Sequence, residues 1–351
     1  MHKAIWRPLS VGRVIDRGFQ LYRTYFVKLM MIVLMTYGPF YLLSLLVQGG
    51  GQEAQGSLLG SLGDTDSLME WVESFNNQNA SMFEGWRGIV YVLVIIPIGV
   101  FFLFPLATGA VVGLVHHAVH GEDIPSAWTL VKRSLKRIGL LAGSTFLFSL
   151  MFIAVYAAAA GGIIGLMIAV FAGGGLAGGG AGSNVALGIV LMLLFFLFLF
   201  ALVIVLVWLA VRWGYFLPFV ALGEEKIGFR RSWRLTKRNF WRMLLMWIVV
   251  GGILNVITMV FQLLIIAVLG GSIFGSLLEA IVSMLAMPIY MLPYVVSFYD
   301  LRARNEGYGL EELIRRTLSA NQVPQDPQQD MRTESQELPG LQPEEWRPKY
   351  E

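Results

Sequence analysis

The residues best suited to chemistry are histidines near the middle of the chain. His116 and His120 are four residues apart, so a helix would place both rings on one face, and Glu122 or Asp123 follows closely. Two imidazoles and a carboxylate form a ligand set that zinc accepts. Histidines next to an apolar stretch are also common at the level of lipid headgroups, and no second group of ligands accompanies these. We therefore expect no metal and no cofactor.

A second candidate is a set of uncharged polar residues within an apolar stretch. Asn255, Thr258 and Gln262 share one face of a helix predicted over 244–269. Such a face either lines a polar path through a membrane or supplies hydrogen bonds between helices, and the second role is the commoner one. No nucleophile with a neighbouring base, no paired carboxylates and no glycine-rich phosphate loop stand out, and we expect a protein that is not an enzyme. The absence of cysteine excludes disulfides and cysteine nucleophiles.

Basic residues recur on one side of three short amphipathic segments. Each segment has apolar residues on one face and lysine or arginine on the other, which is typical of a helix lying in a membrane interface. The aromatic residues among them, and the apolar stretches that follow, favour anionic lipid over nucleic acid as the partner. The predicted headgroup contacts are Arg13, Arg17, Arg23, Lys132, Arg133, Lys136, Arg137, Arg230, Arg231, Arg234, Lys237 and Arg238. The predicted apolar faces are Val11, Ile15, Gly18, Tyr22 and Phe26, then Ile124, Trp128, Val131, Leu135 and Ile138, then Phe229, Trp233, Phe240 and Leu244.

The three segments align with one another. Gly121-Glu-Asp and Gly223-Glu-Glu begin the second and third segments, and Trp128 and Trp233 are each followed by a lysine four residues later. Phe19, followed by an arginine at the same distance, takes the equivalent place in the first segment. We predict three repeated units, each an interfacial helix followed by a hairpin of two membrane spans. The units run near 10–115, 123–212 and 224–300.

Composition places most of the chain in lipid. Of the 351 residues 56% are hydrophobic and 14% are charged, whereas soluble domains carry roughly 25% charged residues. We predict an all-α integral membrane protein with six transmembrane helices, each long enough to cross ~30 Å of hydrocarbon. The predicted spans are 29–47, 88–115, 139–172, 185–210, 244–269 and 276–298. Prolines should bend the second and sixth spans, and the third is long enough to tilt, protrude or break at Gly161-Gly162.

Lysine and arginine are distributed unevenly around these spans. Of the 26 basic residues, all but Arg87 lie on the side that also carries both termini. The positive-inside rule then places both termini in the cytoplasm. We predict a membrane domain over 1–318 and a disordered acidic tail over 319–351, which offers a surface for a cytoplasmic protein partner.

Three segments are similar to a family of bacterial membrane proteins. They are 7–23, the stretch 223–243 around Trp233, and 299–308, which begins Tyr-Asp-Leu-Arg-Ala-Arg-Asn-Glu. Over about 5–315 the chain resembles the membrane domain of glycerophosphoryl diester phosphodiesterase. The resemblance implies a helical domain of the bacterial plasma membrane with an accessory role. The separate catalytic barrel of those enzymes, with its His-Arg start motif, has no counterpart here, so their activity does not carry over.

We therefore expect a non-catalytic scaffold or accessory protein of the bacterial cytoplasmic membrane that contacts anionic lipid. One alternative is a transporter or flippase for a lipid or small molecule, which the repeat, the prolines and the polar face support. Another is a membrane accessory domain that works with a separate enzyme. Ionisable residues within the spans are nearly absent, which counts against ion-coupled transport.

Overall fold

The computed structural model describes residues 9–48, 69, 85–176, 181–269 and 272–306. These residues form helices joined by turns and contain no strand, so the all-α prediction is confirmed. Six helical segments are long and apolar enough to cross a membrane, as predicted. The predicted acidic tail, 319–351, lies outside the described residues.

Long helices alternate with short ones along the chain. The long helices are α2 (Phe26–Gln48), α6 (Phe104–His120), α8 (Ile138–Leu176), α9 (Ala181–Trp213), α12 (Phe240–Leu269) and α13 (Ile273–Asn305). The short helices are α1 (Val11–Thr24), α5 (Gly85–Val90), α7 (Ala127–Leu135), α10 (Phe216–Leu222) and α11 (Phe229–Thr236). Two π-helical turns, η1 (Tyr91–Ile95) and η2 (Ile98–Leu103), connect α5 to α6.

The second candidate span is irregular where its prolines lie. Pro97 immediately precedes η2, and Pro105 stands in the first turn of α6. A proline lacks an amide donor and crowds the preceding turn, and a wider π turn accommodates both effects. By contrast, α8 continues through Gly161 and Gly162 for 39 residues. The third span therefore does not break there, and at 1.5 Å per residue it extends about 58 Å, well beyond the hydrocarbon thickness.

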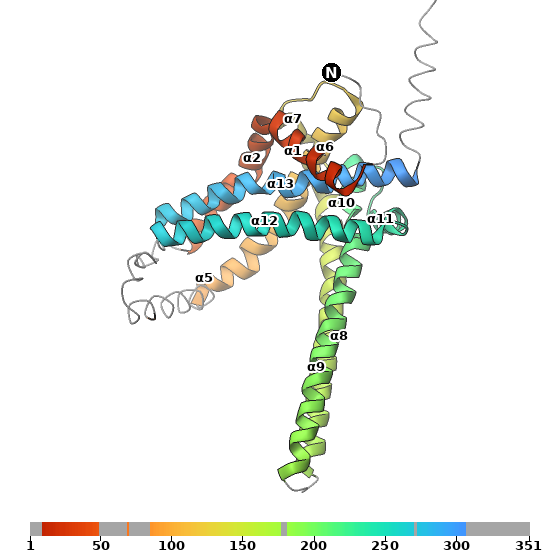
Figure 1. The fold of residues 1–351 in the computed structure, drawn as a ribbon. Coiled ribbons are helices and arrows are strands. Elements are labelled where there is room, and N and C mark those ends of the chain that lie inside the picture. Colours follow the sequence, from red (N-terminus) through yellow and green to blue (C-terminus); the bar gives the residue numbers. More distant parts are fainter. Residues whose placement is uncertain (1–8, 49–68, 70–84, 177–180, 270–271, 307–351) are drawn as a thin grey trace, which may run out of the picture.

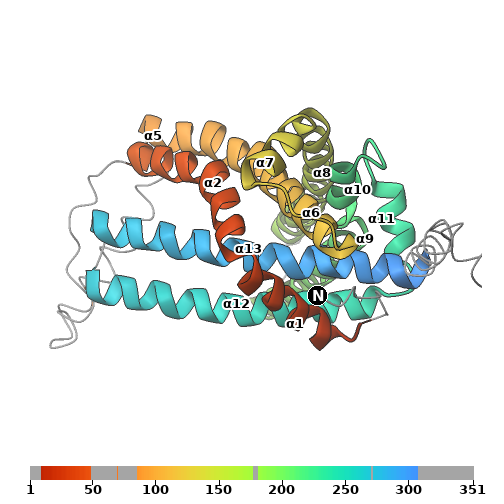
Figure 2. The same cartoon turned by 90° about the horizontal axis from the view of Figure 1, so that it is seen from above.

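The long helices extend from a packed region formed by α1, α7, α10, α11 and the adjoining helix ends, which we call the base. Helix α13 is the most enclosed of the candidate spans, with half of its apolar window buried, and it contacts α1, α2, α6, α11 and α12. The largest fully buried side chains of the base include Tyr215, Phe219, Phe298 and Tyr299. Figures 1 and 2 show α12 and α13 side by side, while α8 and α9 form a separate pair that points away from them.

The three short basic helices bury the residues on either side of a central aromatic residue. Their central aromatic residues, Phe19, Trp128 and Trp233, are exposed or half-buried. The residue before each aromatic and the residue two positions after it are buried instead. These residues are Gly18 and Leu21, Ala127 and Leu130, and Ser232 and Leu235. Small residues allow close approach of backbones, and the central aromatic residues are left outside the core.

The predicted Gly-acid-acid turns are confirmed in both places. Gly121 ends α6 and Gly223 ends α10, with φ angles of +67° and +77° that only glycine adopts easily. In both turns the next residue donates its backbone N–H to the carbonyl five residues earlier, from Glu122 to His117 and from Glu224 to Phe219. This is the Schellman pattern of helix termination. The same turn thus positions both the α6–α7 and the α10–α11 connections.

Candidate functional site at the base of the helices

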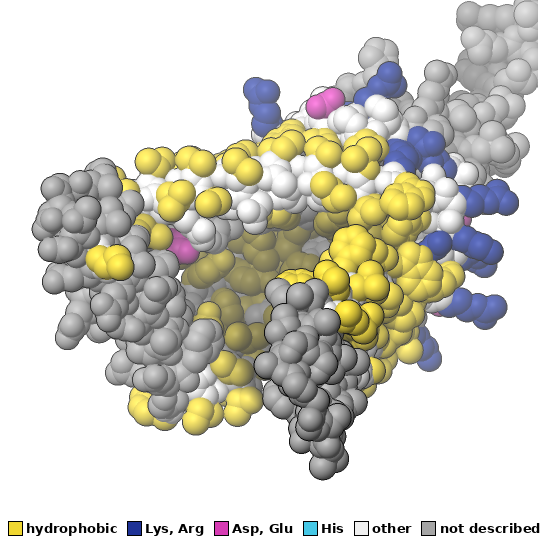
Figure 3. Space-filling view, turned by 60° about the horizontal axis from the view of Figure 1, so that its bottom comes forward, with side chains coloured by type: hydrophobic (Ala, Val, Ile, Leu, Met, Phe, Trp, Pro, Cys, Tyr) yellow, Lys and Arg dark blue, Asp and Glu magenta, His cyan; other side chains and the backbone are white. Residues whose placement is uncertain are grey.

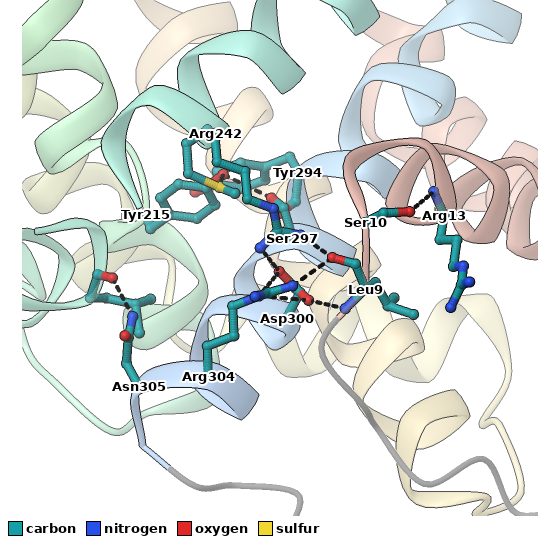
Figure 4. A network of polar contacts seen from close by, with 12 residues as sticks. Leu9, Ser10, Arg13, Tyr215, Arg242, Tyr294, Ser297, Asp300, Arg304 and Asn305 are labelled. Carbon is teal, nitrogen blue, oxygen red and sulfur yellow. Dashed lines mark hydrogen bonds and ion pairs between the residues drawn. The ribbon is translucent and has the colours of Figure 1, made fainter. Parts of the chain in front are cut away.

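A buried carboxylate organises one charged cluster of the base. Asp300, in the last part of α13, has no exposed surface, and an unpaired carboxylate there would be costly. Arg242 Nη1 lies 2.7 Å and Arg304 Nε lies 3.2 Å from Asp300 Oδ2. The backbone N–H of Leu9 donates to Asp300 Oδ1 at 2.6 Å, and the Leu9 carbonyl accepts hydrogen bonds from both arginines. This cluster, the Asp300 lock, fastens the segment before α1 to α12 and α13 (Figure 4).

A second charged cluster closes the opposite side of α13. The two oxygens of Glu224 lie 2.7 Å from Arg231 Nη1 and 2.7 Å from Arg302 Nη1. Glu306 accepts from Arg231 Nε at 3.2 Å and from Arg302 Nε at 2.9 Å. The Arg231 guanidinium also lies over the ring of Phe219, 4.7 Å from its centroid. Two acids and two arginines thus form a neutral ring, the Glu224–Glu306 lock, which joins the α10–α11 turn, α11 and the end of α13.

The arginines of the second lock determine the charge of Glu306. Burial by itself would raise the pKa of Glu306. The hydrogen bonds and positive charges of Arg231 and Arg302 outweigh burial and hold the pKa below its ordinary value of 4.5. The carboxylate is therefore ionised, and the lock closed, at neutral pH.

The two locks bring together three segments that are far apart in the sequence. Segment 7–23 supplies Leu9, segment 223–243 supplies Glu224, Arg231 and Arg242, and segment 299–308 supplies the remaining partners. Each carboxylate of the locks is paired with two arginines, an arrangement suited to holding elements together rather than to moving protons. The sequence reading did not identify these pairs.

Buried hydroxyl groups extend the polar network around the end of α9. The Tyr215 hydroxyl lies 2.8 Å from Ser297 Oγ, and Tyr294 donates to the carbonyl of Gly214 at 2.7 Å (Figure 4). Ser232 Oγ accepts from the backbone N–H of Tyr215 and donates to the carbonyl of Arg212 at 2.9 Å. These bonds fix the end of α9 against α11 and α13.

Arg212, in the last turn of α9, occupies an aromatic cluster. Its guanidinium carbon lies 5.7 Å from the ring centroid of Trp208, 5.4 Å from that of Trp233 and 5.7 Å from that of Phe240. Its Nε and Nη1 atoms are buried and make no hydrogen bond within the described part of the chain. Cation–π contacts contribute about 0.5–2 kcal/mol, whereas a buried donor without an acceptor costs about 1–3 kcal/mol. The rings therefore do not replace the acceptors that this group lacks.

Most of the predicted lipid-contacting side chains are exposed. The exposed ones are Arg13, Arg23, Lys132, Arg133, Lys136, Arg137, Arg230, Arg234, Lys237 and Arg238. Arg17 is half-buried and donates to Gln20, and Arg231 is held by the Glu224–Glu306 lock. In Figure 3 most lysine and arginine side chains gather at the base, while the long helices present apolar side chains.

The predicted polar face of α12 does not line a described cavity. Asn255 and Gln262 are exposed, and Thr258 donates to the carbonyl of Leu254 within its own helix. Gln262 Nε2 donates to Glu279 of α13 at 3.1 Å, which is the role of a hydrogen bond between helices. A cavity of about 340 Å³ lies instead between α8 and α9, lined by apolar residues such as Leu194 and Phe198.

The histidines form a close group at the end of α6. The rings of His116 and His120 have centroids 4.2 Å apart, and His116 Nδ1 lies 2.9 Å from the hydroxyl of Tyr299. His117 lies 3.3 Å from Arg133 and 3.8 Å from Glu122. Within the described ranges, no three histidine, aspartate or glutamate side chains are arranged so that they could hold a metal ion. The histidines thus connect α6 to α7 and α13.

The fold is that of an all-helical protein with six helical segments long and apolar enough to cross a membrane, joined at a charged base. A protein-family model described as a domain of unknown function, DUF7847, matches residues 54–300, and the chain belongs to that family. No curated protein and no solved structure matches the chain.

Proposed function

We propose that this protein is a non-catalytic scaffold or accessory protein of the bacterial cytoplasmic membrane, and that its base binds anionic lipid. The observation that carries the proposal is a division among the basic side chains. Those with carboxylate partners form the two locks, whereas ten of the twelve predicted contacts are exposed and have no carboxylate partner among the described residues. Exposed bases beside apolar helices attract anionic headgroups, with about 1 kcal/mol for each.

The proposal includes three repeated units, each with a short helix lying in the interface. Two observations support this repeat. The same Schellman turn occurs at Gly121 and Gly223. The same positions are buried around Phe19, Trp128 and Trp233, namely the residue before each aromatic and the residue two positions after it. Such a helix has a small-residue face towards the core, aromatic residues towards lipid and a basic edge towards headgroups.

The lipid part of the proposal is tested by neutralising one basic edge. Replacing Arg234, Lys237 and Arg238 with glutamine should lower the ratio of anionic to zwitterionic lipid that purifies with the protein, as measured by mass spectrometry of extracted lipid. Each charge is expected to contribute a factor of about five, and the effect should shrink at high salt. The matched control, Arg234→Lys with Arg238→Lys, keeps the charge and should retain the lipid. An unchanged ratio in the neutralised protein at low salt contradicts the proposal.

The accessory part of the proposal concerns a protein partner. The resemblance to the membrane domain of glycerophosphoryl diester phosphodiesterase supports it, because the segments that carry the resemblance meet in the two locks. We propose that residues 319–351, with seven acids and three bases, bind a cytoplasmic protein partner. A separately encoded enzyme is one such partner. Deleting 319–351 should remove a protein that otherwise purifies with the full chain, and an unchanged set of partners counts against this part.

A transporter or flippase is the second candidate, and two observations favour it. Figure 3 shows an apolar hollow between the α8–α9 pair and the other long helices, and the exposed Gln262–Glu279 pair provides polar groups on otherwise apolar α12 and α13. Movement of labelled phospholipid between leaflets of liposomes distinguishes the two functions. A scaffold leaves that rate at the level of protein-free liposomes.

A further inference from the structure

The Arg212 cluster differs from the exposed basic edges in its surroundings. Arg212 is half-buried, and its guanidinium is surrounded by Trp208 of the same helix, Trp233 of α11 and Phe240 of α12. Its carbonyl is already held by Ser232, so the end of α9 cannot shift freely relative to α11. The charge is therefore presented at a fixed place on the protein.

Arg212 has no counter-ion among the residues that the structure describes. Nε and Nη1 are buried and make no hydrogen bond, whereas Arg212 as a whole is half-buried, so part of its side chain is accessible. The described salt bridges all involve other basic residues. An arginine near the end of a membrane helix directs its charge towards the interface, where a partner from outside the protein can reach its accessible part.

The apolar surfaces beside Arg212 fit acyl chains. Helices α9 and α12 contact each other near this end and then diverge (Figure 1). On α9, Val205 lies two turns from Arg212 and is 45% exposed; on α12, Ile248 lies two turns from Phe240 and is 59% exposed. Two apolar walls thus extend from one cationic point, with tryptophans at the level where headgroups lie.

We propose that Arg212 binds the phosphate of one phospholipid, whose two acyl chains lie along α9 and α12. A guanidinium donates strongly to phosphate oxygens and stacks on aromatic rings at the same time. The inference rests on the proposed function, namely that the protein binds lipid at its base. It assigns one site for one lipid molecule, whereas the exposed basic edges attract anionic lipid collectively.

The test is native mass spectrometry of the full chain in mild detergent, with added phosphatidylglycerol. The wild type should retain one lipid, and Arg212→Gln should reduce its retention at least tenfold. The matched control Lys226→Gln removes an exposed charge of the α10–α11 turn that is not among the predicted headgroup contacts, and it should retain the lipid. Diacylglycerol with the same chains should not be retained, because it lacks the phosphate. Inorganic phosphate should not displace the lipid, because it lacks the chains.

Several results would overturn the site. Equal retention by the wild type and Arg212→Gln, or retention of diacylglycerol, would show that Arg212 does not hold a phosphate. Displacement by inorganic phosphate would show a site for the free anion instead. If Arg212→Gln does not fold, Arg212→Lys takes its place, and it should retain less of the lipid than the wild type does. The comparison of phosphatidylglycerol with diacylglycerol then uses the wild type alone, and equal retention of the two lipids would overturn the site. Neutralising Arg234, Lys237 and Arg238 should leave the single lipid in place. Loss of that lipid with those charges, but not with Arg212, would support the collective binding alone.

Discussion

At the scale of single residues, buried charge in this protein is held in locks. Asp300 is fully buried, yet it has two arginine partners and a backbone N–H. Removing one member of such a group is costly because the others remain buried without a partner. The locks therefore hold the base in one arrangement even if each ion pair adds little net free energy.

We expect Asp300→Asn to destabilise the protein by about 3–5 kcal/mol, because Arg242 and Arg304 lose their carboxylate. Thermal unfolding in detergent measures the effect. The control is Asp16→Asn, since Asp16 is exposed on α1. A double-mutant cycle with Arg242→Gln should give a coupling clearly above zero, and additive effects would show that the ion pair contributes nothing.

The Glu224–Glu306 lock should make stability depend on acid. The pKa of Glu306 is lower in the folded protein than its ordinary value of 4.5. The contribution of its carboxylate is therefore fully present above that value and is lost as the pH falls below it, through the folded pKa. Unfolding temperatures measured from pH 6 to pH 3 should fall less steeply for Glu306→Gln than for the wild type. Parallel curves for the two proteins would contradict the assignment.

At the scale of helices, close packing depends on small residues. A Cβ added at Gly109 of α6 would lie 2.4 Å from Ser134 Oγ of α7 and 3.3 Å from Leu141 Cδ1. Ser134 itself donates to the carbonyl of Leu106, so it cannot turn away without losing a hydrogen bond. The α6–α7 contact therefore has no room for even one methyl group.

Gly109→Ala should destabilise the protein by about 1–3 kcal/mol through overpacking. The matched control is Gly143→Ala on α8, where an added Cβ meets nothing within 4 Å. Alanine is the better helix former by about 1 kcal/mol, so the control should be neutral or stabilising. Adding Ser134→Ala to Gly109→Ala should recover part of the loss in thermal unfolding. Equal effects of the two glycine substitutions would show that the α6–α7 contact can relax.

At the scale of the whole molecule, the pairs of long helices diverge from one base. The buried residues of the main core belong largely to the base, whereas the distant parts of α8, α9 and α12 expose large apolar side chains. Such surfaces are stable only against lipid or another apolar partner. This arrangement places the basic residues and both locks at one end of the molecule.

The orientation of that end can be measured by labelling, because the natural chain has no cysteine. We expect Ser57→Cys, which lies in sequence between the first two predicted spans, to react in intact cells with a maleimide that cannot cross the membrane. Lys226→Cys, in the α10–α11 turn, should react only after the membrane is opened. Labelling of Lys226→Cys in intact cells would overturn the predicted topology.

The sequence alone determined the features that depend on local spacing. Six apolar stretches, the two glycine turns and the uneven placement of lysine and arginine are readable because length, periodicity and turn chemistry act over a few residues. The same reasoning identified the three basic segments. It did not predict which of their residues pack against the core, because that depends on the helices that they meet.

Only the tertiary structure decided which charges meet. Leu9 and Asp300 are 291 residues apart, and Arg231 and Glu306 are 75 apart, so no local pattern connects them. The same holds for the direction of the α8–α9 pair, which points away from α12 and α13. It holds also for the aromatic rings around Arg212, which come from three helices. Pairing and burial depend on how helices pack in space, and one sequence read by its periodicity does not contain that information.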